Sequence, residues 1–185
     1  PNVVVFVREQ TSTTLFDSVL KGETDFGVGP IVPAADFSFE PILSDPLYAV
    51  VPRSMIPNRR RTIDLVELAE MPLLLLDSAS ALRKLLEEKM RERDLVLKTR
   101  HQFSQALTLS AMAAAGLGVG ILPKVVLPAT PDPSVQILRI TPALYREVAI
   151  ITRRGQELSP AAARLAQLIR DLIDDDGASG PTPTA

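Results

Sequence analysis

Hydroxyl side chains occupy three places where an apolar run gives way to an expected helix, and these places could hold a small acid. They are the segments Thr11 to Thr14 and Ser78 to Ser80, and the residue Ser104. In open α/β sheets, ligands bind beyond the carboxyl ends of the strands, where helix amino termini converge. Backbone amides at a helix start, together with hydroxyls, suit a carboxylate or another small anion. The alternative for each hydroxyl is that it only caps its own helix.

The chain offers little for acid–base or metal chemistry. His101 is the single histidine and there is no cysteine, which excludes His–Cys pairs and multi-histidine metal sites within the chain. A serine triad would need His101, but the sequence has no Gly-x-Ser-x-Gly elbow. We expect His101 to line or cap a loop. We therefore expect no catalytic residue, no metal site and no cofactor.

The charge balance argues against a nucleic-acid surface on this chain. Its 20 Lys and Arg residues face 22 Asp and Glu residues, whereas binding to phosphates needs a concentrated positive face. The run Arg59-Arg60-Arg61 is an exception that we interpret as a solvated loop, with phosphate binding as the alternative. The apolar runs are too short to cross a bilayer, and no signal-peptide pattern is visible. The lack of cysteine fits a cytoplasmic protein.

Apolar periodicity predicts strands that alternate with helices, and hence an α/β fold with a mainly parallel sheet. The expected strands are 3–7, 25–28, 47–52, 73–76, 95–99, 119–122, 135–140 and 147–152. The expected helices follow Thr14, Asp64, Ser80, Ser104 and Ser159. We expect 3–7 to be a buried strand, because it is a continuous β-branched and aromatic run.

Several side chains have expected roles at the ends and on the faces of these helices. Thr14 with Asp17 could form a capping box, and Asp64, Ser104 and Ser159 are expected caps. Glu87 and Arg91 are spaced to pair across one helical turn. The last helix should bury an apolar stripe made of Leu165, Leu168, Ile169, Leu172 and Ile173. We expect Asp174 to Asp176 to begin a frayed tail, because negative charge is disfavoured at a helix carboxyl end.

The segment Ala113 to Pro123 alternates glycines after a small-residue helix. Gly116 is placed to close the helix in the left-handed conformation, and Gly118 and Gly120 allow neighbouring backbone to approach closely. The helix precedes the strand here, which is the reverse of a dinucleotide-binding fingerprint. We therefore interpret the glycines as structural rather than as a nucleotide loop.

This segment resembles part of the effector-binding domain of LysR-type transcriptional regulators. Further elements in the same order are similar to that family: Pro1 to Val5, Leu20 to Val28, Asp45 to Pro52, Ile63 to Ala69 and Ser159 to Ala162. The resemblance spans nearly the whole chain. The family domain normally begins with a further strand and helix before Pro1, and the family's DNA-binding helix-turn-helix is absent from this sequence.

The resemblance implies a periplasmic-binding-protein-like fold (type II) with two α/β lobes around a ligand cleft. Lobe I would comprise residues 1–46 and the carboxyl-terminal helix at 153–176. Lobe II would comprise residues 47–152, and residues 177–185 would form a flexible tail.

The resemblance also implies a function, namely sensing a small organic effector that carries a carboxylate and alters promoter binding by the parent oligomer. It places the effector contacts at Ser12, Thr13, Gly29, Pro30, Ser78, Ala79, Ser80, Phe103 and Ser104. Arg8 and Arg83 are near enough in sequence to help bind a charged effector. A solute-binding protein of a transport system, which shares this architecture, is the alternative function.

Overall fold

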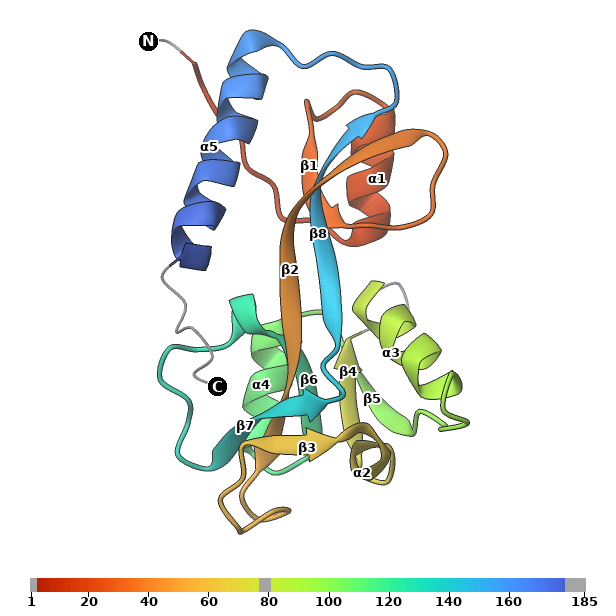
Figure 1. Ribbon diagram of the computed structural model, residues 1–185, viewed down its shortest axis with the longest axis vertical. Helices are drawn as coiled ribbons and strands as arrows, with labels where there is room; N and C mark the ends of the chain where they lie inside the picture. Colours follow the sequence, from red (N-terminus) through yellow and green to blue (C-terminus); the bar gives the residue numbers. More distant parts are fainter. Residues whose placement is uncertain (1–2, 77–80, 179–185) are drawn as a thin grey trace. The chain divides into compact units, whose positions relative to one another are not determined.

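The computed structural model describes residues 3–76 and 81–178 of the chain, which forms two compact units. Unit 1 consists of Pro1–Ser44 and Glu147–Ala185, and unit 2 consists of Asp45–Arg146. The chain passes from unit 1 into unit 2 along β2 (Phe37–Pro52) and returns along β8 (Tyr145–Arg153) (Figure 1). Two long strands therefore connect the units.

Unit 1 is built on an antiparallel pair of strands. β1 (Gly27–Pro30) pairs with β8, from Gly27 opposite Ile151 to Pro30 opposite Val148. Helix α1 (Ser12–Leu20) packs on β1, where a Cβ atom at Gly27 or Gly29 would come within 2.7 Å of the Leu15 side chain. Glycine at both positions thus lets α1 lie close to the strand. The second helix of the unit is α5 (Pro160–Ala178).

Unit 2 contains a mixed sheet with helices around it. β4 (Leu73–Leu76) lies between β5 (Thr99–Phe103) and β6 (Val119–Pro123) and is parallel to both. The second half of β2 pairs antiparallel with β6 and with β7 (Val135–Thr141), and β3 (Thr62–Asp64) runs parallel to β7. The helices are α2 (Leu65–Ala69), α3 (Ala81–Arg91) and α4 (Ala106–Ala114), and a 3-10 turn, η1 (Lys124–Val126), follows β6.

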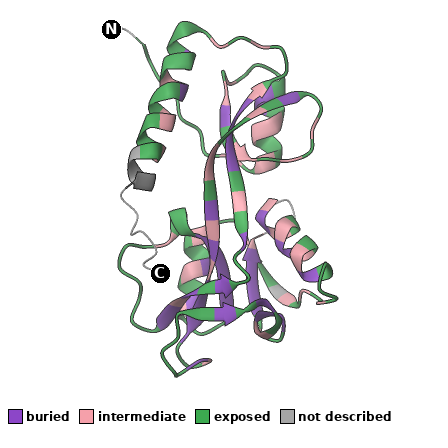
Figure 2. Ribbon diagram, viewed as in Figure 1, coloured by how far each residue is buried: buried purple, intermediate pink, exposed green. Residues whose placement is uncertain are grey.

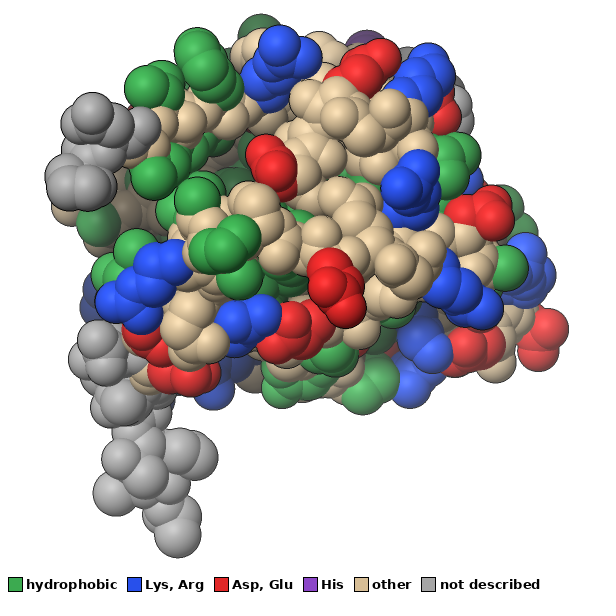
Figure 3. Space-filling view, turned by 90° about the horizontal axis from the view of Figure 1, so that it is seen from above, with side chains coloured by type: hydrophobic (Ala, Val, Ile, Leu, Met, Phe, Trp, Pro, Cys, Tyr) green, Lys and Arg blue, Asp and Glu red, His purple; other side chains and the backbone are tan. Residues whose placement is uncertain are grey.

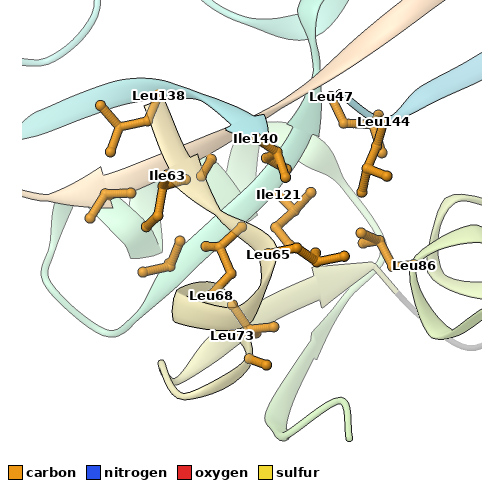
Figure 4. Close-up of a cluster of buried hydrophobic side chains, with 14 of the residues drawn as sticks. Leu47, Ile63, Leu65, Leu68, Leu73, Leu86, Ile121, Leu138, Ile140 and Leu144 are labelled. Atoms are coloured by element: carbon orange, nitrogen blue, oxygen red, sulfur yellow. The ribbon is translucent and has the colours of Figure 1, made fainter. Parts of the chain in front are cut away.

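The larger hydrophobic core lies in unit 2, between its sheet and helices α2 and α3. Ile63, Leu65, Leu68, Ile121 and Leu138 are fully buried there and belong to one cluster of apolar side chains (Figure 4). Strands β4 and β6 are buried along most of their length, whereas α5 of unit 1 is mostly exposed (Figure 2). Unit 1 has a smaller core, in which the rings of Phe16 and Phe37 pack edge to face with their centroids 5.1 Å apart.

The glycine segment has the geometry expected from its sequence. Gly116 adopts φ +84° after α4, and Gly118 and Gly120 are buried. A Cβ atom at Gly118 would overlap the Pro72 carbonyl oxygen, and one at Gly120 would overlap the Leu109 side chain. The prediction of a structural turn is thus confirmed.

Two of the expected helix caps are present. The Asp64 carboxylate accepts a hydrogen bond from Val66 N at 2.8 Å, and Ser159 Oγ accepts one from Ala162 N at 3.2 Å. In both cases the side-chain oxygen satisfies an amide that has no acceptor inside the helix.

The expected strand at residues 3–7 is wrong. No strand forms there, and Val3, Val5, Phe6 and Val7 are all more than half exposed. An apolar β-branched run becomes a strand only where a neighbouring strand accepts its backbone hydrogen bonds and another layer covers its side chains. Among the described residues, nothing does either for this segment.

Other local predictions need correction because caps and element bounds differ from the predicted ones by a few residues. Thr11, not Thr14, caps α1, and Gln105, not Ser104, precedes α4 without a side-chain cap. The strand expected at 95–99 begins only at Thr99, and the strand expected at 25–28 runs from Gly27 to Pro30. Apolar periodicity does not fix where pairing starts, because the partner strand decides it.

The face and the end of α5 also differ from expectation. Ala162 and Ala166 are buried, whereas Leu168 and Leu172 of the expected stripe are 42% and 65% exposed. The helix continues to Ala178, so the expected start of the tail at residue 177 is wrong, and residues 179–185 lie outside the described chain. A helix buries only the face that another element covers.

Two pairing predictions are also wrong. Glu87 pairs with Arg83 at 2.8 Å rather than with Arg91. The sheet is mixed rather than mainly parallel, because β1–β8, β2–β6 and β2–β7 are antiparallel pairs. Strand direction depends on which strands become neighbours, and the periodicity of a single strand does not contain that information.

Candidate functional site

The start of α1 is the first junction with hydroxyl groups. Thr11 is the N-cap, its Oγ1 accepts from Thr14 N at 3.4 Å, and its carbonyl accepts from Leu15 N at 2.9 Å. Ser12 and Thr13 are the first two helical residues, so their amides have no acceptor within the helix. Within the described part of the chain, neither of their hydroxyls makes a hydrogen bond. Because Thr11 provides the cap, both hydroxyls are available to a ligand.

Gly29 and Pro30 lie at the carboxyl end of β1, beside this helix start. Leu15, one turn into α1, packs directly against Gly29, and Ile31 N donates to Glu147 O at 3.1 Å just beyond the strand. The predicted residues of unit 1, namely Ser12, Thr13, Gly29 and Pro30, thus lie on two elements that pack against each other, α1 and β1. The small size of Gly29 is what permits this approach.

The other predicted residues belong to unit 2. Phe103 ends β5 opposite Leu76, the last residue of β4, and its half-buried ring packs against the cluster around Leu74 and Leu109. Ser104 follows it and is exposed. Ser78, Ala79 and Ser80 lie outside the described residues, directly after β4. Phe103 and Ser104 therefore lie at the carboxyl ends of parallel strands, where ligand loops are expected.

The two arginines considered as effector contacts differ in their surroundings. Arg8 is exposed in the extended segment before α1. Arg83 lies on α3 with its side chain only 14% exposed, and its Nε donates to Glu87 Oε1 at 2.8 Å. Its Nη1 is buried and has no hydrogen-bond partner among the described residues. Glu87 thus already neutralises the charge of Arg83.

The described residues form no cluster that could bind a metal ion. His101 is exposed on β5, in a strand rather than in the loop expected for it. Within residues 3–76 and 81–178, no group of three acidic or histidine side chains could hold a metal ion.

The helices of the described chain include none that is long and apolar enough to cross a bilayer. On the face shown in Figure 3, positive and negative side chains are interspersed rather than gathered by sign.

Two hollows open on unit 2, and sequence reasoning did not predict either. The first, here called the arginine hollow, measures about 340 Å³ and is lined by Arg53, Arg59, Arg60, Pro131, Asp132, Pro133, Val135, Gln136 and Ile137. The second measures about 420 Å³ and lies mainly between α4 and residues 126–137. Neither contains a predicted effector residue. The Arg59 to Arg61 run was the available signal for the first, and it was interpreted as a solvated loop.

Hydrogen bonds shift the ionisation of charged groups around the arginine hollow. Arg60 donates from both terminal nitrogens to Glu67, at 2.7 and 2.8 Å, which lowers the pKa of the Glu67 carboxyl and raises the pKa of Arg60. Hydrogen bonds from the Ser134 hydroxyl and amide lower the pKa of Asp132. Both carboxylates therefore remain charged at neutral pH.

Known proteins resemble the chain in both sequence and fold. The uncharacterized HTH-type transcriptional regulator YbhD of Escherichia coli strain K12 is 29% identical over 178 residues, which cover 95% of this chain and 56% of that protein. The chain thus spans about half the length of this relative.

Among solved structures, the effector-binding domain of QuiR in complex with shikimate matches with a TM-score of 0.80 at 18% identity, over 90% of this chain and 79% of that one. The CcmR regulatory domain of Synechocystis PCC6803 in complex with 2-PG matches with a TM-score of 0.78 at 16% identity, over 88% and 79%. These likenesses show the type II periplasmic-binding-protein-like fold. The family model of the LysR substrate binding domain matches residues 1–174, and the chain belongs to that family.

Proposed function

We propose that this chain is the effector-sensing domain of a LysR-type transcriptional regulator and that it binds a small organic ligand carrying a carboxylate. The observation that supports this most directly is the start of α1. Thr11 caps the helix there, and the hydroxyls and amides of Ser12 and Thr13 have no hydrogen-bond partner among the described residues. Amides at a helix start and free hydroxyls suit a carboxylate. Phe103, at the end of β5, and Ser104, which follows it, stay predicted contacts.

The comparisons favour a regulator over the alternative of a solute-binding protein for transport. The relatives are named as transcriptional regulators, and the QuiR domain is described as an effector-binding domain holding shikimate, a small carboxylate. A binding role also fits the exposed position of His101, the only histidine, better than catalysis does. We infer that the chain is not an enzyme and needs no cofactor.

The mechanism that we propose is a shift between two arrangements of the parent protein. An effector that binds one arrangement more tightly than another moves the equilibrium toward the first, by as much as its affinities differ. The parent would be a cytoplasmic homodimer or higher oligomer. It would contact DNA through a helix-turn-helix that is not part of this chain.

A thermal-shift screen of the chain against mono- and dicarboxylates, aromatic acids and amino acids tests this function. An effector at about 100 times its dissociation constant should stabilise the chain by about 2.7 kcal/mol. For a domain of this size, that corresponds to a rise in Tm of about 5–11 °C. Selective stabilisation by one class of acids is the expected result. A flat response across all acids, from a chain that unfolds cooperatively, would count against it.

A further inference from the structure

The arginine hollow lies at the edge of the sheet opposite the predicted effector residues of unit 2. Pro52, at the carboxyl end of β2, is opposite Val135, where β7 begins. Because β2 is antiparallel to β6, and β6 is parallel to β4, this edge contains the amino ends of β4 and β6. Phe103 lies at the carboxyl end of β5, which is parallel to β4. The hollow is therefore separate from the predicted effector residues Phe103 and Ser104 of unit 2.

A buried glutamine holds one wall of the hollow in place. Gln136 is only 5% exposed, and its Nε2 donates to Ile56 O at 2.6 Å and to Asn58 O at 3.1 Å. Its Oε1 accepts from Arg60 N at 3.2 Å. All three contacts tie residues 56–60 to β7. The segment carrying Arg59 and Arg60 is therefore fixed to the sheet before any ligand arrives.

Two of the three arginines have terminal nitrogens that make no hydrogen bond within the described part of the chain. Arg60 is engaged by Glu67 through both terminal nitrogens. Arg53 uses only Nε, which donates to Pro133 O at 2.9 Å and leaves its two terminal nitrogens available. Arg59 makes no hydrogen bond or ion pair within the described part of the chain. The single opposing charge in the lining is Asp132, which Ser134 binds through two hydrogen bonds.

We propose that the arginine hollow is a second ligand site, which binds a small oxyanion through Arg53 and Arg59. A planar guanidinium presents paired donors that match the oxygens of a phosphate or carboxylate group. A volume of about 340 Å³ accommodates such a group at the end of a small metabolite. This site is independent of the effector site proposed above, so either can fail without the other.

Calorimetric titrations of the chain with inorganic phosphate and, separately, with succinate test the site. Chloride is titrated as the control anion, and the ionic strength is the same in all titrations. Arg59→Gln should weaken binding about tenfold, because it removes charge-assisted hydrogen bonds. Arg93→Gln is the matched control, since Arg93 is exposed on the same unit and does not line the hollow. The ligand that binds more tightly identifies a phosphate or a carboxylate as the recognised group.

A third variant should change the affinity for the oxyanion in the opposite direction. Asp132→Asn should strengthen binding several-fold, because it removes the negative charge and keeps an acceptor for Ser134. An acid that stabilises the wild type in the thermal-shift screen should raise the Tm of Arg59→Gln by the same amount. Absence of binding by both probes overturns the proposal, as does binding that Arg59→Gln and Arg93→Gln weaken equally.

Discussion

Arg146 Nη2 lies 2.9 Å from Asp45 Oδ2, and this ion pair joins the two strands that connect the units. Asp45 is 2% exposed and is the first residue of unit 2, whereas Arg146 is the last. The other oxygen of the carboxylate accepts from Val125 N at 3.3 Å, which adds η1 to the same contact. In unit 1, the adjacent residues Ser44 and Glu147 are joined by a hydrogen bond of 2.6 Å. Asp45 thus ties three segments of the chain together.

We expect Asp45→Asn to destabilise the chain by about 2–3 kcal/mol, because it leaves Arg146 without its counter-charge. Arg146 is 28% exposed, so water compensates for part of the loss. The fall in Tm should be about 4–12 °C. Glu70→Gln is the control, because its pair with Lys98 is exposed and should contribute less than about 1 kcal/mol. Equal changes in Tm for the two variants would contradict the role of Asp45.

Substitutions at Thr11 and Ser12 should distinguish an effect on folding from an effect on ligand binding. Thr11→Ala removes the cap of α1 and should cost about 1 kcal/mol of stability. Ser12→Ala should leave Tm nearly unchanged and weaken effector binding about tenfold, since its hydroxyl makes no hydrogen bond in the described chain. Ser38→Ala, at an exposed hydroxyl of the same unit, should change neither Tm nor the affinity for the effector. A lower Tm with unchanged affinity in Ser12→Ala would mean that Ser12 acts only in folding.

Gly118→Ala should destabilise the chain by about 3 kcal/mol, because the new methyl group meets the Pro72 carbonyl oxygen, which accepts from Val119 N at 2.9 Å. Gly116→Ala should cost only about 1 kcal/mol. Its positive φ is strained for alanine, but the space around it is open. Chemical denaturation of both variants measures the difference, and a larger loss for Gly116→Ala would contradict the packing argument.

The Arg60–Glu67 pair should make a small, pH-dependent contribution to stability. The hydrogen bond from Arg60 lowers the pKa of Glu67 in the folded chain, so the contribution is full above the ordinary value of 4.5 and is lost as pH falls through the lower folded pKa. Both side chains are 36% exposed, which limits it to about 0.5 kcal/mol. The Tm difference between wild type and Glu67→Gln should shrink from pH 7 to pH 3. A difference that grows toward low pH would refute this.

Local features of this chain follow from the sequence because neighbouring residues determine them. Asp64 and Ser159 cap their helices, Gly116 takes the left-handed conformation, and Leu73 to Leu76 form a buried parallel strand, all as predicted. A cap needs only the amides two or three residues ahead of it. The order of such elements was also sufficient to suggest the family.

The tertiary structure decided everything that depends on a distant partner. Residues 3–7 have the composition of a buried strand, yet they are exposed because no described segment pairs with them. Gln136 lies 76 residues from Arg60, and the pairing of β2 and β3 with β7 brings them together to shape the arginine hollow. The Asp45–Arg146 pair spans 101 residues for the same reason. Periodicity encodes which face of an element is apolar, but packing selects its neighbour.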